Sequence, residues 1–319
     1  MSQPTPTYRP PNFAGIRTFM RLPHKTDLDG VDIAIVGVPF DTGVTHRVGG
    51  RFGPEAIRSY SMLLRGHNSV LNVSVFEYCS AIDYGDLDVT PGYLHESHRQ
   101  IEQGASKLFA NNVTPIFLGG DHSISLPLLR AATAKYGSLA LVHFDSHNDL
   151  GHGSYGDKDS HGTPFRRAVE ENLLNLDHSI QIGLRGSNHR ADDIQISRDL
   201  MDVITGVELH EMGMPAAIER IQARVGNKLA YLTFDIDFVD PAFAPGTGTP
   251  EVGGFTSAQT LQLLRGLQGL NFVGFDCVEV IPVYDPTTVT CLLAANIVFE
   301  FMSLIALQRK NNQTQPIQR

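Results

Sequence analysis

Cysteine is scarce in this chain, which has only Cys79, Cys277 and Cys291 among its 319 residues. Because the number is odd and no C-x-x-C pair occurs, the sequence predicts neither a disulfide framework nor a thiolate metal site. An isolated cysteine usually behaves as a small hydrophobic side chain. We therefore expect all three to be core residues.

An excess of basic residues is also missing, since the formal net charge is −9 and the Lys and Arg residues are scattered along the chain. Without a basic stripe there is no surface for a nucleic-acid backbone, so nucleic acid is not an expected partner. The N-terminal stretch has no apolar signal core, and no stretch approaches the roughly 18 apolar residues of a membrane span. We expect no membrane partner and a cytoplasmic location.

The chain contains neither an internal repeat nor a Gly/Ser-rich linker, but short β-rich runs alternate with helical patterns along it. Strands that are apolar on both faces and separated by helices predict a mainly parallel sheet covered on both sides. We predict a single three-layer α/β/α domain over residues 31–307. An irregular arm, residues 1–30, precedes it, and a flexible polar tail, residues 308–319, comes after it.

Three predicted strands end in acidic and imidazole side chains. In open α/β sheets, ligands bind beyond the carboxyl ends of the strands, so these ends are the expected place for a site. The segments are "GGDHS", "HFDSHND" and "FDIDFVD", which carry Asp121 and His122; His143, Asp145, His147 and Asp149; and Asp235, Asp237 and Asp240.

The spacing of these residues favours a metal site over ordinary polar loops. Alternate residues of an extended chain share a face, so Asp145, His147 and Asp149 can converge, as can Asp235 and Asp237. Four carboxylates gathered in a cleft would repel one another unless their pKa values rise or cations bind. Four negative charges match two divalent ions. A single D-x-H-x-D is more often a polar loop than a metal site, but three such strand ends together favour the metal site.

The donor types narrow the choice of metal. Oxygen donors with a pair of imidazoles and no thiolate suit Mn²⁺ best, leave Ni²⁺, Co²⁺ and Fe²⁺ as alternatives, and disfavour structural zinc. Two ions about 3.5 to 4 Å apart can share a hydroxide that acts as a hydrolytic nucleophile. The residues therefore predict a binuclear metallohydrolase.

These segments resemble the signatures of the ureohydrolase family, which includes arginase, agmatinase and related guanidino-acid hydrolases. The resemblance extends to "GVPFDTGVTHRVGGRFGPEAIR", "HGTPFRRAVEENLL" and "GFDCVEVIPVYD", and it covers about residues 14 to 305. It is closest to the branch of agmatinase, guanidinobutyrase and proclavaminate amidinohydrolase. It implies an arginase-like fold and hydrolysis of the guanidino C–N bond of a small guanidine to urea, or a urea analogue, and an amine.

The resemblance also implies roles for individual residues. One metal would be held by His122, Asp145, Asp149 and Asp235, and the other by His147, Asp145, Asp235 and Asp237. Asp149 would also orient the bridging hydroxide. His161 would pass a proton to the departing amine, and Glu279 would pair with the substrate guanidinium. No ligand role is implied for His143 or Asp121, which we expect beside the metals, whereas Arg47 and Arg51 are expected to anchor a loop or a subunit contact.

The segment from Asn148 to Ser160 departs from the family pattern, because relatives commonly have a small residue and a Thr in place of Asn148 and Leu150. We expect this segment to line the substrate pocket, with Leu150 as an apolar wall and His152 as a titratable group. Leu150 and Gly151 have no side-chain hydrogen-bonding groups for the α-amino acid end of arginine, so arginine is a disfavoured substrate. The expected substrates are agmatine, a short guanidino acid, or an N-alkylated guanidine or biguanide.

Other classes of protein remain compatible with parts of the pattern. A histone-deacetylase-like amidase would use one zinc and leave His122 and Asp237 without a purpose. A non-catalytic ureohydrolase-like subunit would have no reason to keep the charged cluster. The resemblance implies a homo-oligomer, a trimer or a hexamer, in which "FMRLPH" of the arm is a candidate contact. The chain could also be the active subunit of a hetero-oligomer.

Overall fold

Eight strands form one sheet in which every pair of neighbours is parallel. The computed structural model describes residues 11–188 and 190–314. The sheet order is β4-β1-β5-β10-β9-β6-β7-β8. The strands are β1 (Ile33–Gly37), β4 (Ala81–Asp86), β5 (Thr114–Leu118), β6 (Ala140–Phe144), β7 (Ile180–Leu184), β8 (Asp202–Thr205), β9 (Leu229–Asp235) and β10 (Asn271–Val278). The short strands β2 (His67–Asn68) and β3 (Val73–Ser74) pair separately and antiparallel.

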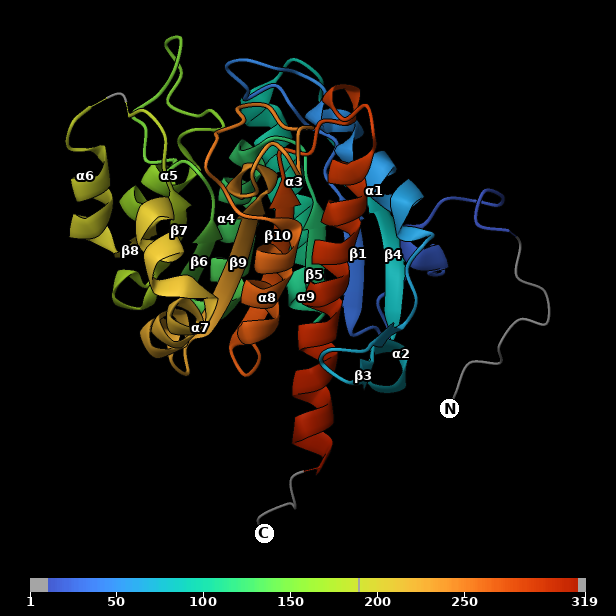
Figure 1. The fold of residues 1–319 in the computed structure, drawn as a ribbon. Helices are drawn as coiled ribbons and strands as arrows, with labels where there is room; N and C mark the ends of the chain where they lie inside the picture. The colour runs from blue at the N-terminus through green and yellow to red at the C-terminus, as the bar shows by residue number, and fades with distance from the viewer. Residues whose placement is uncertain (1–10, 189, 315–319) are drawn as a thin grey trace.

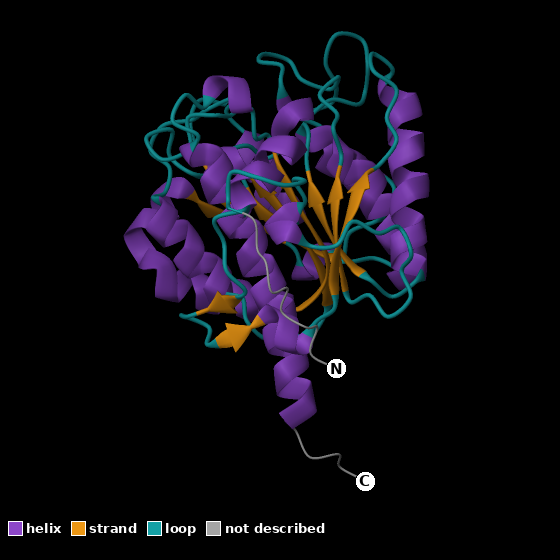
Figure 2. Cartoon of the chain, turned by 90° about the vertical axis from the view of Figure 1, so that its right-hand side faces the viewer, coloured by secondary structure: helices purple, strands orange, loops and turns teal. Residues whose placement is uncertain are grey.

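Helices cover both faces of this sheet (Figures 1 and 2). Successive residues of β1 show why, because Ile33 and Ile35 belong to one buried cluster and Ala34 and Val36 to the other. The first cluster includes side chains of α1 (Gly53–Ser61), α7 (Gly206–Val225), α8 (Ser257–Gly266) and α9 (Val289–Thr314). The second includes side chains of α3 (Leu94–Ala110), α4 (Ser125–Tyr136) and α5 (Pro164–Glu170). The short helices α2 (Val75–Tyr78) and α6 (Asp193–Leu200) complete the layers. The predicted three-layer parallel fold is confirmed.

The three cysteines are buried, as expected from their isolation in the sequence. Burial raises the pKa of the Cys79 thiol to about 12. Burial also raises the pKa of Cys291 above its usual value, so neither residue is a thiolate at neutral pH. They act as small core residues.

Helix α9 corrects two expectations drawn from the sequence. Its residues Val289–Asn312 include a window with a mean hydropathy of 2.0, so one described segment is long and apolar enough to cross a membrane, contrary to our expectation. That window is 83% buried inside the molecule, which is the environment of a core helix. The helix also continues to Thr314, so residues 308–314 of the expected flexible tail are helical. Gln308 donates a hydrogen bond to Asn271, which fixes this last part to β10.

The described part of the N-terminal arm packs on the domain. Phe19 and Met20, which we expected as candidate subunit contacts, are buried against the same chain. The backbone N–H of Phe19 donates to the Asp83 carboxylate at 2.7 Å, and that of Met20 donates to Ser61 at 2.7 Å. These apolar side chains are therefore part of the core.

A buried ion pair joins this arm, α1 and the edge strand β4. Arg58 donates two hydrogen bonds to Asp83, at 2.9 and 3.0 Å, and one to Asp86 at 2.6 Å. Asp83 is 1% exposed, and it also accepts the Phe19 N–H. Burial alone would lower the pKa of Arg58, but its carboxylate partners raise it above the usual value.

We expect Arg58→Met to lower the free energy of unfolding by about 3–5 kcal/mol, because it leaves the Asp83 charge buried without its partner. Urea denaturation followed by circular dichroism measures this change. The control Arg99→Met removes a fully exposed pair with Glu96 and should leave the transition midpoint unchanged. A similarly small effect of Arg58→Met would show that the pair does not stabilise the fold.

Candidate metal centre

The six predicted metal ligands follow or end β5, β6 and β9, at the carboxyl ends of the strands. Figure 2 shows the arrowheads of the sheet meeting the loops at this edge. His122 begins a short 3₁₀ helix, His122–Ile124, that comes after β5. Asp235 ends β9, and Asp237 lies in the adjoining 3₁₀ helix Ile236–Phe238. The other three, Asp145, His147 and Asp149, come after β6, which pairs with β9. Because all strands are parallel, these segments lie at one edge of the sheet.

His122 Nδ1 lies between three carboxylates, 3.1 Å from Asp145, 3.0 Å from Asp149 and 3.3 Å from Asp235. It makes no hydrogen bond with any residue that the structure describes, although it is buried. The other ring nitrogen, Nε2, has a hydrogen-bond partner in Thr233. Thr233 donates its hydroxyl proton to Asp276 at 2.6 Å, so its oxygen accepts from His122 Nε2 at 2.8 Å. In the neutral ring, Nδ1 therefore carries the lone pair, and it faces carboxylate oxygens. Burial opposes a charged ring here, but Asp145, Asp149 and Asp235 raise the pKa of His122 well above its usual value, so Nδ1 keeps a proton until cations replace it.

The second half of the cluster is formed by His147, Asp145 and Asp237. His147 Nδ1 lies 3.0 Å from Asp237 Oδ2 and 3.5 Å from Asp145 Oδ1. Ser146 donates its hydroxyl to Asp237 Oδ1 at 2.6 Å, whereas the buried Oδ2 accepts no hydrogen bond from the described residues. One atom each of Asp145, His147 and Asp237 lies within 4.8 Å of the others, a spacing suited to a shared ion.

The carboxylates of the cluster are in electrostatic conflict. Burial, together with the charges of Asp237 and Asp145, raises the pKa of Asp235 well above its usual value. Burial and the charge of Asp145 also raise the pKa of Asp237. Burial acts in the same direction on Asp145, but the surrounding imidazoles outweigh it and hold the pKa of Asp145 well below the usual range.

Imidazole nitrogens here face buried carboxylates that repel one another, and a pair of cations would relieve this repulsion. The residues present therefore fit two divalent ions. The same arrangement without cations would leave several buried polar atoms unsatisfied, which folded proteins rarely tolerate.

Two polar residues support the segment after β6, and one of them, Gln181 of β7, was not selected in the sequence analysis. Gln181 is the register partner of His143, and its amide donates to His143 Nδ1 at 2.9 Å and to the Asn148 carbonyl at 2.7 Å. His143 Nε2 then donates to Asp145 at 2.8 Å, so both of its ring nitrogens are engaged. The hydrogen bond to the Asn148 carbonyl fixes the backbone next to Asp149. Asp149 has a φ of 51°, a left-handed conformation that costs a non-glycine residue free energy and needs such support.

His161 and Glu279 lie next to the cluster and next to each other. Glu279 Oε1 accepts the His122 N–H at 2.9 Å and lies 3.2 Å from His161 Nδ1. Its Oε2 is buried and has no hydrogen-bond partner among residues 11–188 and 190–314. His161 Nε2 lies 2.8 Å from the Thr45 hydroxyl. Burial opposes the charged imidazole, but Glu279 raises the pKa of His161 to about 9. Asp121 holds the neighbouring loop by accepting the Gly43 N–H at 2.7 Å.

The two remaining predicted substrate residues differ in exposure. Leu150 is 4% exposed and packs with Phe165, whose ring contacts those of His122 and His143, so it lies behind the cluster. His152 is exposed at the surface of the loop. The two loop arginines have structural partners. Arg47 donates to the Thr247 carbonyl, and Arg51 pairs with the buried Asp41.

A parallel three-layer fold with a carboxylate and imidazole cluster at its strand ends defines a metal-dependent α/β enzyme. A family model described as the arginase family matches residues 31–304. This chain is 43% identical over 309 residues to guanidinobutyrase of Pseudomonas aeruginosa, covering 96% of this chain and 97% of the relative. It is 41% identical over 292 residues to mitochondrial agmatinase of Gallus gallus, covering 91% and 86%.

A solved structure, proclavaminate amidinohydrolase of Streptomyces clavuligerus, superposes with a TM-score of 0.90 at 40% identity, covering 93% of this chain and 99% of that one. The chain belongs to the arginase family, whose members are binuclear metal-dependent ureohydrolases. The resemblance inferred from the sequence motifs is therefore confirmed.

We expect two divalent ions per chain to bind, and each ion to raise the unfolding free energy by about 2.7 kcal/mol at a free metal concentration about 100 times its Kd. Asp235→Asn should reduce the metal content below two. Without metal, this variant should unfold at or above the wild-type temperature, because it removes a carboxylate that burial and Asp237 disfavour. Elemental analysis and thermal unfolding with and without Mn²⁺ measure both effects. The exposed Asp88→Asn is the control, and two tightly bound ions in Asp235→Asn would refute the assignment.

Proposed function

We propose that this chain hydrolyses the guanidino C–N bond of a small guanidine compound and releases an amine together with urea or a urea analogue. The observation that carries the proposal is the buried, unpartnered Oε2 of Glu279 beside His161 and the metal cluster. The named relatives that act on guanidino compounds support it. Agmatine, short guanidino acids and N-alkylated guanidines or biguanides are the candidate substrates.

Glu279 is suited to bind the guanidinium. It is 1% exposed, so a free carboxylate oxygen there is unfavourable until a cationic donor reaches it. A planar guanidinium offers such donors in a fixed geometry that matches a carboxylate. Glu279 is held at a φ of 61° by the chain around it, so its carboxylate is preorganised.

The proposal includes two sets of metal ligands, which the family resemblance implies and the closeness of these side chains supports. His122, Asp145, Asp149 and Asp235 would hold one ion, and His147, Asp145, Asp235 and Asp237 would hold the other. When bound, the metal pair supplies an activated water as the nucleophile and neutralises the developing negative charge. The oxygen-rich donor set favours Mn²⁺, with Ni²⁺ as the alternative. A mononuclear zinc amidase would leave His122 and Asp237 without a role, which disfavours that alternative.

His161 is suited to donate a proton to the departing amine nitrogen. Glu279 raises its pKa to about 9, so the ring is protonated at neutral pH. A guanidinium that binds Glu279 competes for the same carboxylate and would lower this pKa toward the value at which proton donation is efficient. Thr45 and Glu279 together fix the orientation of the ring.

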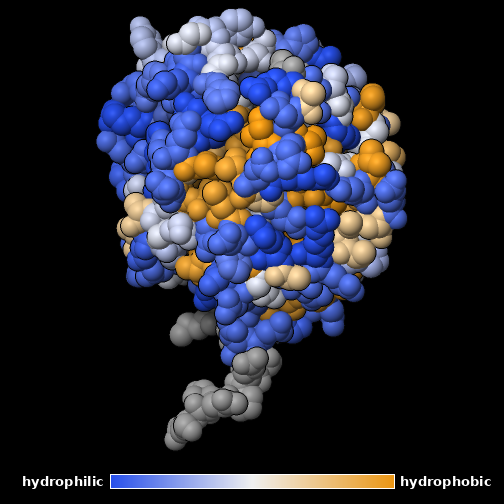
Figure 3. All heavy atoms as spheres, turned by 90° about the vertical axis from the view of Figure 1, so that its left-hand side faces the viewer, coloured by the Kyte–Doolittle hydropathy of each residue, from blue (hydrophilic) through white to orange (hydrophobic). Residues whose placement is uncertain are grey.

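The proposal also covers the oligomeric state and the location of the chain. Figure 3 shows apolar side chains gathered among hydrophilic ones on the face that lies to the left in Figure 1. Such patches favour subunit contacts. We propose a homo-oligomer, a trimer or hexamer, in the cytoplasm, with a hetero-oligomer containing this active chain as the alternative. The intact set of charged site residues argues against a non-catalytic subunit.

We expect urea release from at least one member of a panel containing agmatine, 4-guanidinobutyrate, 3-guanidinopropionate, N,N-dimethylbiguanide, free guanidine and L-arginine, with enzyme loaded separately with Mn²⁺ and Ni²⁺. Glu279→Gln should lower kcat/KM by about 30-fold or more, because losing one partner of a buried charge pair costs about 2–5 kcal/mol. A colorimetric urea assay measures this loss.

The matched control is Glu77→Gln, an exposed glutamate on α2, and metal content should be unchanged in both variants. No urea from any member of the panel, with two ions bound per chain, would contradict the proposal. Fastest turnover of L-arginine would contradict the substrate range.

A further inference from the structure

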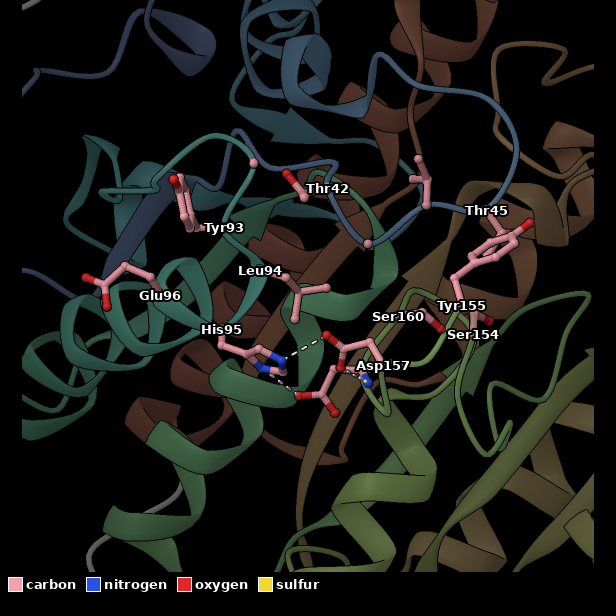
Figure 4. A pocket seen from close by; sticks show the side chains of 14 residues that line it. Thr42, Thr45, Tyr93, Leu94, His95, Glu96, Ser154, Tyr155, Asp157 and Ser160 are labelled. Carbon is pink, nitrogen blue, oxygen red and sulfur yellow. Dashed lines mark hydrogen bonds and ion pairs between the residues drawn. The ribbon is translucent and has the colours of Figure 1, made fainter.

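A cavity of about 450 Å³ lies beside His161. Figure 4 shows the side chains around it, which come from the loop after β1, the start of α3 and the loop before His161. These segments are Thr42–Thr45, residues 92–96, and a set of loop residues formed by Ser154, Tyr155, Asp157, Asp159 and Ser160.

This cavity shares a wall with the catalytic residues but not with the metal ligands. Thr45 lines it, and the Thr45 hydroxyl lies 2.8 Å from His161 Nε2. Ser160 lines it and directly precedes His161, whose N–H donates to the Gly43 carbonyl at 2.9 Å. On the opposite side of the His161 ring, Nδ1 faces Glu279. The cavity therefore continues the site beyond His161.

The charge on the cavity wall is negative. His95 Nε2 lies 2.9 Å from Asp157, and its Nδ1 lies 3.5 Å from Asp159. The Asp159 N–H, and to a lesser extent His95, lower the pKa of Asp157, so this carboxylate is ionised at neutral pH. No Lys or Arg is among the described residues that line the cavity. The two carboxylates share one imidazole between them.

The remaining lining is apolar and aromatic. Val44 and Leu94 contribute aliphatic surface, and the rings of Tyr93 and Tyr155 lie at the rim. Glu96 contributes less, because it pairs with Arg99 and points away from the cavity. Aromatic faces and carboxylates both attract cations, and both disfavour anions.

We infer that this cavity binds the end of the substrate distal to the guanidinium, and that Asp157 and Asp159 select a cationic end over a carboxylate end. The inference rests on the proposed guanidine hydrolysis. The unpartnered Oε2 of Glu279, on the other side of His161, independently indicates that the site binds a cation there. The favoured substrates would thus carry a second, positively charged nitrogen group.

The test compares 4-guanidinobutylamine with 4-guanidinobutyrate, which have the same carbon chain and opposite end charges. We expect kcat/KM to favour the amine by at least about tenfold, since juxtaposed like charges strongly suppress a wrong ligand. The double variant Asp157→Asn/Asp159→Asn should bring the ratio close to one, mainly through KM. His95→Ala should increase the preference, because it frees both carboxylates. Asp88→Asn, an exposed site elsewhere, should leave the ratio unchanged.

A binding measurement separates this inference from the proposed function. Isothermal titration of the metal-loaded protein with 1,4-diaminobutane and 4-aminobutanoate should show tighter binding of the diamine, which the double variant loses. Urea release that is faster from the carboxylate would overturn the inference and leave the function intact. No urea from any member of the panel would overturn the function, and the titration would then decide on the cavity alone.

Discussion

The repulsion among buried carboxylates at one edge of the sheet is the constraint on which the rest of the structure depends. Asp145, Asp235 and Asp237 are almost fully buried, and burial disfavours each of their charges. The chain can hold them there only because parallel strands fix the backbone from which they extend and because cations compensate their charge. The fold therefore has a built-in affinity for divalent metal. Its long buried helix α9 and its two hydrophobic clusters supply the stability that offsets the cost of this arrangement.

Polar side chains inside the strands direct the donor atoms. Asp276 lies opposite Thr233 in the register of β9 and β10, and it accepts hydrogen bonds from Thr233, Ser125 and Tyr231. This fixes the Thr233 oxygen as an acceptor and so determines which nitrogen of His122 faces the cluster. Gln181 of β7 acts on Asp145 in a similar way, through the ring of His143. Such support, more than the ligands alone, decides whether a metal site is rigid.

Local pattern in the sequence was sufficient to predict the layers of the fold and the place of the metal cluster. Alternating apolar runs indicated the parallel three-layer fold, and polar residues after "LALV" and "AYLTF" indicated the strand ends that converge. Local pattern could not show that Leu150 turns into the core, because an apolar residue after a metal ligand can face either way. Thr45 and His161 are 116 positions apart, so only the tertiary fold brings them together. Gln181 and Thr233 did leave a signal, since each is a polar residue in the middle of a buried strand.

In the proposed mechanism, His161 would couple recognition to chemistry, because it lies between the two parts of the proposed site. On one side it contacts Glu279, whose Oε1 is already occupied by the His122 N–H, so that only Oε2 is open to a ligand. On the other side it contacts Thr45, which forms the cavity wall. A molecule that reaches Glu279 but leaves the cavity empty would constrain the ring from one side only. A molecule that fills both would fix the proton donor and the scissile bond together, and correct positioning of this kind accounts for a large part of catalysis. Substrate choice in this chain is therefore expected to appear in the rate of the chemical step as well as in binding.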